Sequence, residues 1–165
     1  MKGIFFFISF LAVIGLQAQD SIDAVLKTHN KNNIPYISVT EARMLQLQGK
    51  AILVDARNRE EFEVSAIASA KHINSHPFSF EEFEKSFPNK NELIIVYCSL
   101  GVRSEDFAEK LKKIGYTQVK NLYGGIFEWK NSGFPVLNSK GEETEKIHTF
   151  SKAWEKYLEK GIKVN

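Results

Sequence analysis

Residues 93–104 read LIIVYCSLGVRS, and this stretch decides how the chain folds. Its first part, Leu93 to Tyr97, is a short apolar run rich in β-branched residues, which predicts a strand covered on both faces, as in a parallel sheet. The only cysteine of the chain, Cys98, follows at once. The apolar residues from Phe107 to Ile114 then share one face of a helix, and Gly115 is placed to end it. A strand that passes through a short loop into a helix is the repeating unit of an α/β fold.

The same alternation extends outward along the chain. Residues 51–54 (AILV) and 119–122 (VKNL) predict two further short strands, the second stopped by two glycines at 124 and 125. Capping-box patterns at residues 38–41 and 79–82, and a looser one at 58–61, predict the starts of three helices. We therefore expect a single α/β domain, with a parallel sheet flanked by helices on both faces.

The composition narrows the class of function. The 165 residues amount to about one domain. With 22 Lys+Arg against 20 Asp+Glu, the charge is nearly balanced, so electrostatics gives no reason to expect nucleic acid or an anionic membrane as a partner. The four histidines are scattered without metal-ligand spacing, and no glycine-rich nucleotide motif is present. We therefore expect no metal and no cofactor. The sequence does not fix the oligomeric state.

The N-terminus has the pattern of a secretory signal peptide. Lys2 is followed by an apolar stretch from Ile4 to Leu16 and then by Ala18, after which we expect cleavage. The stretch falls short of the roughly 20 apolar residues that a membrane-spanning helix needs, so no stable membrane anchor is expected. The alternative is a buried N-terminal helix. The sequence thus predicts an exported protein, periplasmic or secreted, whose lone thiol has no internal disulfide partner.

The position of Cys98 predicts a reactive thiolate. In open α/β sheets, ligands bind at the carboxyl ends of the strands. The loop that leads into the next helix directs backbone N–H groups and the positive helix end toward the sulfur, and Arg103 adds a cation. Such surroundings favour the thiolate form of a cysteine. We expect a sulfur that lies at the floor of an anion cradle and is open to solvent. The alternative is that Cys98 is a small buried core residue.

In three segments the sequence resembles the rhodanese family of sulfurtransferases in its single-domain form. Residues 98–104, in the pattern C-x-x-G-x-R-S, resemble the six-residue active-site loop of that family and the residue after it. Residues 52–62 are similar to its "hydrophobic-D-x-R…E-E-F" segment, and residues 121–136 to its "L-x-G-G…W…G-x-P-V" signature. One departure stands at residues 65–70, which read SAIASA where the family usually has GHIPGA.

The resemblance implies a reaction and a set of site residues. Cys98 would take a sulfane sulfur from a small anionic donor such as thiosulfate, or from a persulfide, and pass it from a Cys98 persulfide to a thiol or cyanide acceptor. Arg103 would receive the anionic donor, and backbone N–H groups of the loop would stabilise the persulfide. Asp55 and Arg57 are expected to form a supporting charge pair near the end of the sheet. The residues expected to bind substrate are Ser99, Leu100, Gly101, Val102, Arg103 and Ser104.

Two other functions stay open. The first is a non-catalytic rhodanese-like module that binds a partner. The second is a cysteine-dependent phosphatase, although such enzymes place five residues between the cysteine and the arginine, and this chain has four between Cys98 and Arg103. The expected organisation is a signal peptide at 1–18, an N-terminal extension at 19–35, a rhodanese-like domain at 36–137 and a C-terminal extension at 138–165. In that last segment the apolar residues from Ile147 to Leu158 predict an amphipathic helix of roughly four turns that docks on its own domain.

Overall fold

The computed structural model of the chain describes residues 21–73 and 79–165. The predicted signal peptide at 1–18 lies outside these residues, as does His76.

The centre of the fold is a parallel sheet. Five strands lie side by side in the order β1-β5-β4-β2-β3, and every neighbouring pair is parallel. β4 lies in the middle, with Ile95 beside Leu53 of β2 on one side and Lys120 of β5 on the other. The strands are β1 (Tyr36–Ile37), β2 (Ile52–Asp55), β3 (Lys71–His72), β4 (Ile94–Tyr97) and β5 (Val119–Leu122). The predicted α/β fold with a parallel sheet is confirmed.

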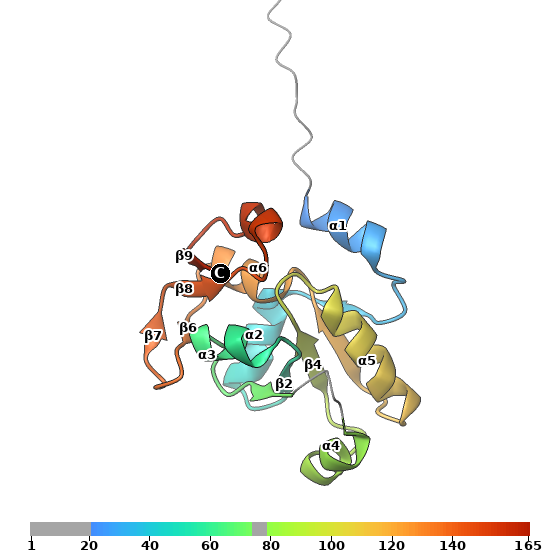
Figure 1. Cartoon of the computed structure of the whole chain (residues 1–165). Helices are drawn as coiled ribbons and strands as arrows, with labels where there is room; N and C mark the ends of the chain where they lie inside the picture. The colour runs from blue at the N-terminus through green and yellow to red at the C-terminus, as the bar shows by residue number, and fades with distance from the viewer. Residues whose placement is uncertain (1–20, 74–78) are drawn as a thin grey trace, which may run out of the picture.

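Helices cover both faces of the sheet, as expected (Figure 1). Because successive side chains of a strand point to opposite faces, Ile94 and Val96 join one core cluster while Ile95 and Tyr97 join the other. The first cluster includes residues of α4 and α5, and the second includes residues of α2 and α6. The helices are α1 (Ile22–His29), α2 (Val39–Leu47), α3 (Arg59–Val64), α4 (Phe80–Ser86), α5 (Arg103–Lys113) and α6 (Gly125–Asn131).

The predicted capping residues start the helices. Ser38 Oγ accepts a hydrogen bond from the backbone N–H of Glu41 at 3.2 Å, and Ser79 Oγ accepts one from Glu82 at 3.3 Å. At the third start, the Glu61 carboxylate accepts from the backbone N–H of Asn58 at 3.1 Å. These bonds satisfy N–H groups that a helix end leaves without intrahelical partners.

Residues 65–70 form a turn despite their departure from the family pattern. Ala70 N donates to Ile67 O at 3.0 Å, and Ser69, the third residue of the turn, has φ +63°. A positive φ at that position is the pattern of a type II turn, which usually has proline and then glycine at its two central positions. In this chain Ala68 and Ser69 occupy these two positions, and both suit them less well than proline and glycine do.

The predicted four-turn helix of the C-terminal extension is wrong. The segment instead contains β8 (Lys146–His148), the 3-10 helix η1 (Lys152–Tyr157) and β9 (Ile162–Val164), and β8 pairs with β9 in parallel. Before them, β6 (Val136–Leu137) pairs with β7 (Glu143–Thr144) in antiparallel fashion. Here the pairing of β8 with β9 outweighs the helical periodicity of the apolar residues. The local sequence pattern could not indicate this pairing, because the partner strand comes later in the chain. The extension does dock on its own domain, since Ile147, Tyr157 and Leu158 belong to a core cluster.

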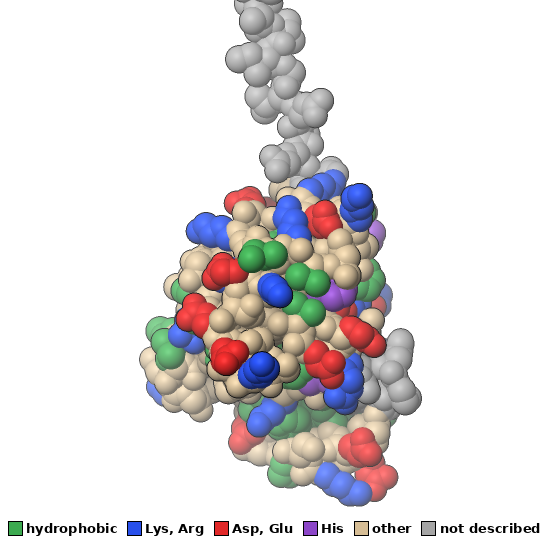
Figure 2. Space-filling view, turned by 60° about the vertical axis from the view of Figure 1, so that its left-hand side comes forward, with side chains coloured by type: hydrophobic (Ala, Val, Ile, Leu, Met, Phe, Trp, Pro, Cys, Tyr) green, Lys and Arg blue, Asp and Glu red, His purple; other side chains and the backbone are tan. Residues whose placement is uncertain are grey.

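The surface carries charges of both signs. Figure 2 shows acidic and basic side chains interspersed over the face in view. Among residues 21–73 and 79–165, no helix combines the length and the apolar character needed to span a bilayer.

Candidate active site

The cysteine loop, defined here as residues 98–104, follows β4 at the carboxyl edge of the sheet. Gly101 has φ +109°, and this conformation brings its backbone N–H to 3.2 Å from the sulfur of Cys98. A side chain there would be crowded, because a Cβ on Gly101 would lie 3.3 Å from the carbonyl oxygen of Leu122. The hydroxyl of Ser104 lies 3.5 Å from the same sulfur. The structure thus places one of the expected backbone donors, the N–H of Gly101, at Cys98, together with the hydroxyl of Ser104, which was not expected as a donor.

The sulfur of Cys98 is buried, so the expectation that it is open to solvent is wrong. The N-terminal extension packs on the cysteine loop. Asn30 Nδ2 donates to Gly101 O at 2.9 Å, and Leu26 of α1 lies against Gly101. In Figure 1, α1 lies at the end of the sheet from which α5 begins. Because these contacts come from a segment that precedes the first strand, loop spacing alone could not indicate them.

A buried polar chain links Ser104 to the rest of the loop through Asn121 of β5. The Ser104 hydroxyl donates to Asn121 Oδ1 at 2.8 Å, and Asn121 Nδ2 donates to Gly101 O at 2.8 Å. A hydroxyl has one proton, so a Ser104 that donates to Asn121 still offers a lone pair to the Cys98 thiol, and it can turn its proton to a thiolate. Asn121 was not among the predicted site residues, and its signal was a polar amide in a short, largely buried strand.

Arg103 is held by Glu61 of α3 in a two-pronged ion pair. Its Nη1 and Nη2 each lie 2.7 Å from a carboxylate oxygen of Glu61, and Nη2 also donates to Ser99 Oγ at 3.0 Å. Burial favours a raised pKa for Glu61, but the hydrogen bonds and charge of Arg103 outweigh it and hold that pKa below its usual value. Burial likewise opposes a charged Arg103, yet Glu61 and the charge of Cys98 raise the Arg103 pKa above its usual value.

The ion pair changes the role expected for Arg103. Arg103 was expected to bind an incoming anionic donor, whereas in this structure the edge of its guanidinium faces Glu61. Glu61 was noted only as part of a capping pattern and a family segment. Its signal was a carboxylate on the first turn of a helix at the same edge of the sheet as Arg103.

An aromatic ring from the C-terminal extension covers the face of the same guanidinium. The ring of Phe150 lies 4.2 Å from Arg103 Cζ, within cation–π distance. Phe150 has φ +65°, a conformation that bulky residues rarely adopt. No sequence pattern pointed to this contact, because the segment was expected to be helical.

The supporting pair is present where it was predicted. Arg57 Nη2 lies 2.6 Å from Asp55 Oδ2, and both side chains are completely buried. Arg57 Nη2 also donates to the carbonyl of Ser65 at 2.6 Å. The pair therefore ties the end of β2 to the segment that leads into the 67–70 turn.

The first turn of α6 binds the backbone of the cysteine loop through two hydrogen bonds. Ile126 N donates to Cys98 O at 2.9 Å, and Phe127 N donates to Ser99 O at 3.1 Å. Gly125 lies so close to the loop that a Cβ there would overlap the carbonyl oxygen of Cys98 and lie 2.7 Å from that of Ser99. The glycine permits the close approach that fixes the loop backbone.

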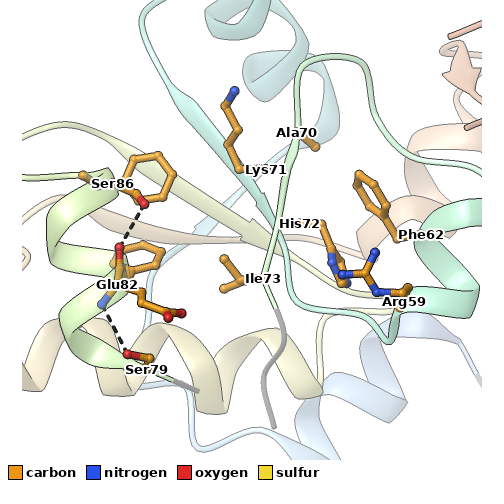
Figure 3. Close-up of a pocket in the computed structure, with 11 residues that line it drawn as sticks. Arg59, Phe62, Ala70, Lys71, His72, Ile73, Ser79, Glu82 and Ser86 are labelled. Carbon is orange, nitrogen blue, oxygen red and sulfur yellow. Dashed lines mark hydrogen bonds between the residues drawn. The ribbon is translucent and has the colours of Figure 1, made fainter. Parts of the chain in front are cut away.

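A separate cavity of about 900 Å³ lies between α3, β3 and α4 (Figure 3). Its lining includes Arg59, Lys71 and His72, but none of the cysteine loop. His72 is already engaged, since its Nε2 lies 3.0 Å from Arg57 O and its ring packs on Phe62. Within residues 21–73 and 79–165, no group of three His, Cys, Asp or Glu side chains is arranged to hold a metal ion.

Comparison with known proteins identifies the family. A family model described as "Rhodanese-like domain" matches residues 38–132, more than half of the chain. The chain belongs to the rhodanese-like domain family. Leu26 and Asn30, which contact Gly101, and Phe150, which lies over Arg103, all come from outside the rhodanese-like match.

Relatives share the rhodanese-like region and differ in overall length. A tRNA uridine(34) hydroxylase of Enterobacter sp. (strain 638) is 29% identical over 118 residues, which cover 66% of this chain and 34% of the relative. The chain thus spans about a third of that protein. A rhodanese-like domain protein from Staphylococcus aureus is 32% identical, with a TM-score of 0.51 over 58% of this chain and 91% of its own. The human single-domain sulfurtransferase TSTD1 is 26% identical, with a TM-score of 0.52 over 59% of this chain and 96% of its own.

Proposed function

We propose that this protein is an exported sulfurtransferase that carries a sulfane sulfur on Cys98. The observation that supports the proposal is the sulfur at the carboxyl end of β4, with the N–H of Gly101 and the hydroxyl of Ser104 beside it. Both groups can stabilise negative charge on sulfur, first on the thiolate and then on the persulfide. The human single-domain protein TSTD1, which the match covers over 96% of its length, is named a sulfurtransferase.

The reaction divides into two nucleophilic steps. The Cys98 thiolate attacks the outer sulfur of the donor, a new S–S bond forms, and the old one breaks. The leaving group, sulfite from thiosulfate or a thiolate from a persulfide, departs with the electron pair. A cyanide ion or an acceptor thiolate then attacks the outer sulfur of the Cys98 persulfide and releases the Cys98 thiolate. No external oxidant or reductant is needed.

Access to the sulfur requires movement of its cover. Because Cys98 has no exposed surface, neighbouring groups must move before a donor reaches it. We propose that the segment with Leu26 and Asn30, which contacts the loop at Gly101, is the part that moves. Opening of small covering elements is a common step in enzymes and often limits turnover.

Burial of Cys98 also favours a second candidate, a non-catalytic binding module in which the cysteine is only a core residue. A phosphatase is less well supported, because the arginine that would bind a phosphoryl group is paired with Glu61. Some relatives are named for action on a tRNA uridine. This chain matches only about a third of their length, so their names provide little support for the same activity here.

Intact-mass spectrometry distinguishes the two leading candidates. We expect the wild-type protein to gain one sulfur atom after exposure to thiosulfate or glutathione persulfide, and to lose it on addition of cyanide. Cys98→Ser should gain none. If neither donor adds sulfur to the wild type, while Cys98 is alkylated normally after unfolding in urea, the binding module is the better description.

We also propose export, supported by the signal-peptide pattern of residues 1–18. The first described helix begins at Ile22, downstream of the expected cleavage site. Expression of the full chain in a bacterial host should yield an exported form whose N-terminal sequence begins at Gln19. Retention of the whole product in the cytosol with residues 1–18 attached would contradict this prediction.

A further inference from the structure

The only basic side chain of the cysteine loop, that of Arg103, is enclosed on its edge and on one face. Both terminal nitrogens donate to Glu61, and Nε is buried without a hydrogen-bond partner among the described residues. The Phe150 ring lies over the guanidinium at 4.2 Å. An incoming anion would therefore compete with the Glu61 carboxylate for the terminal nitrogens, and the Phe150 ring blocks its approach to the face of the guanidinium that the ring covers.

The charges around the sulfur disfavour a small dianion. Glu61 cancels the charge of Arg103, and the thiolate that must attack the donor adds a negative charge of its own. Thiosulfate carries two negative charges and would approach a site whose net charge is already negative. A persulfide of an organic thiol, R–S–SH, brings no charge on the sulfur that is transferred while it is protonated.

The conformation of Phe150 indicates a role beyond packing. Its backbone has φ +65°, a strained region for a bulky residue, and strain of this kind concentrates at functional sites. The backbone N–H of Phe150 donates to His148 Nδ1 at 3.0 Å, and its ring contacts Trp154 with centroids 5.2 Å apart. The residue as a whole remains 42% exposed, so part of its surface is accessible to a ligand.

We propose that Phe150 is a specificity-determining residue that shields Arg103 from inorganic anions and packs against the organic group of a persulfide donor. This inference rests on the proposed sulfurtransferase function. In the step it selects, the Cys98 thiolate attacks the outer sulfur of R–S–SH and forms Cys98–S–SH. The S–S bond of the donor breaks, and R–S⁻ leaves with the electron pair.

The test compares kcat/KM for glutathione persulfide and for thiosulfate. For the wild type, we expect kcat/KM for glutathione persulfide to exceed that for thiosulfate by at least about 100-fold. Phe150→Ala should lower kcat/KM for the persulfide by up to about 10-fold, the upper range of an aromatic contact, without lowering it for thiosulfate. Phe150→Tyr should retain the wild-type ratio. Phe80→Ala is the matched control and should leave both values of kcat/KM unchanged. Phe80 is also 42% exposed, but it lies on α4, which contributes no residue to the cysteine loop.

A second variant tests the charge argument. Glu61→Gln should leave Arg103 with a net positive charge and raise kcat/KM for thiosulfate about 10-fold through a lower KM. If Phe150→Ala is unfolded by circular dichroism, Phe150→Gly removes the ring and accepts the positive φ. Equal use of both donors by the wild type, or a parallel loss for both in the Phe150 variants, would overturn the inference while the sulfurtransferase function stands. If neither donor transfers sulfur to Cys98, the proposed function itself fails.

Discussion

Glu61 is the residue on which the geometry around Arg103 depends. Its carboxylate is almost fully buried, and it accepts hydrogen bonds from Arg103 and from the hydroxyl of Ser99. Removing one partner of a fully buried ion pair costs about 3–5 kcal/mol, and the partial exposure of Arg103 should bring the cost for this pair to the bottom of that range or below it. We predict that Glu61→Gln lowers the free energy of unfolding by about 2–3 kcal/mol at pH 7, measured by urea denaturation.

An exposed pair provides the control for this measurement. Glu81 pairs with Lys85 at 2.8 Å on the surface of α4. Glu81→Gln should change the free energy of unfolding by less than about 0.5 kcal/mol, as is typical of exposed helix pairs. Equal effects of the two substitutions would contradict the importance of the Glu61 pair.

The same carboxylate should make stability depend on pH. The folded state lowers the pKa of Glu61, so its contribution is fully present above the unfolded value of about 4.3 and is lost as the pH falls through the folded pKa. The stability difference between wild type and Glu61→Gln should therefore narrow as the pH falls below about 4. A difference that stays constant between about pH 6 and pH 3 would contradict the pKa shift.

Gly125 is the residue that permits contact between α6 and the cysteine loop. Gly125 and Gly133 both have positive φ, +56° and +82°, but only at Gly125 would a Cβ overlap the loop backbone. We predict that Gly133→Ala costs about 1 kcal/mol, whereas Gly125→Ala costs more than about 3 kcal/mol and abolishes loading of sulfur on Cys98. Thermal unfolding and intact-mass spectrometry would measure both effects, and similar costs at the two positions would contradict the prediction.

At the scale of elements, the sequence was most informative where local signals and tertiary packing agree. The dense apolar runs predicted β2, β4 and β5, and the capping patterns predicted the starts of three helices. Contacts across long sequence separations were beyond such signals. Arg103 and Glu61 are 42 positions apart, and β8 pairs with a strand that comes after η1. The apolar spacing of residues 147–158 fits a helix, and only the partner strand decides against it.

The turn at residues 67–70 allows a prediction at this scale. Ser69 holds φ +63° without the conformational freedom of glycine. A left-handed conformation costs a residue with a Cβ about 1–2 kcal/mol, and the greater freedom of glycine in the unfolded chain offsets part of any gain. We predict that Ser69→Gly raises the free energy of unfolding by about 0.5–1 kcal/mol in urea denaturation. A decrease in the free energy of unfolding would mean that the Ser69 hydroxyl stabilises the folded state by more than the positive φ destabilises it.

For the whole molecule, the two extensions are part of the folded domain. The family match covers residues 38–132, yet Ile147 of β8 is completely buried in a core cluster. We predict that Ile147→Ala lowers the free energy of unfolding by about 2–5 kcal/mol. Ile162→Ala, in the paired strand β9 and 56% exposed, should cost less than about 1 kcal/mol. Urea denaturation of both variants measures the difference, and equal effects would show that the extension is only loosely attached.

The packing of α1 on the cysteine loop has a kinetic consequence. If Asn30 and Leu26 must leave Gly101 before any small molecule reaches Cys98, a sulfur atom bound there is sheltered between encounters. Its residence time would then be set by how often the helix departs. Release would become independent of acceptor concentration once acceptor is abundant, and two copies of the chain could not join through a Cys98–Cys98 disulfide while the helix is in place.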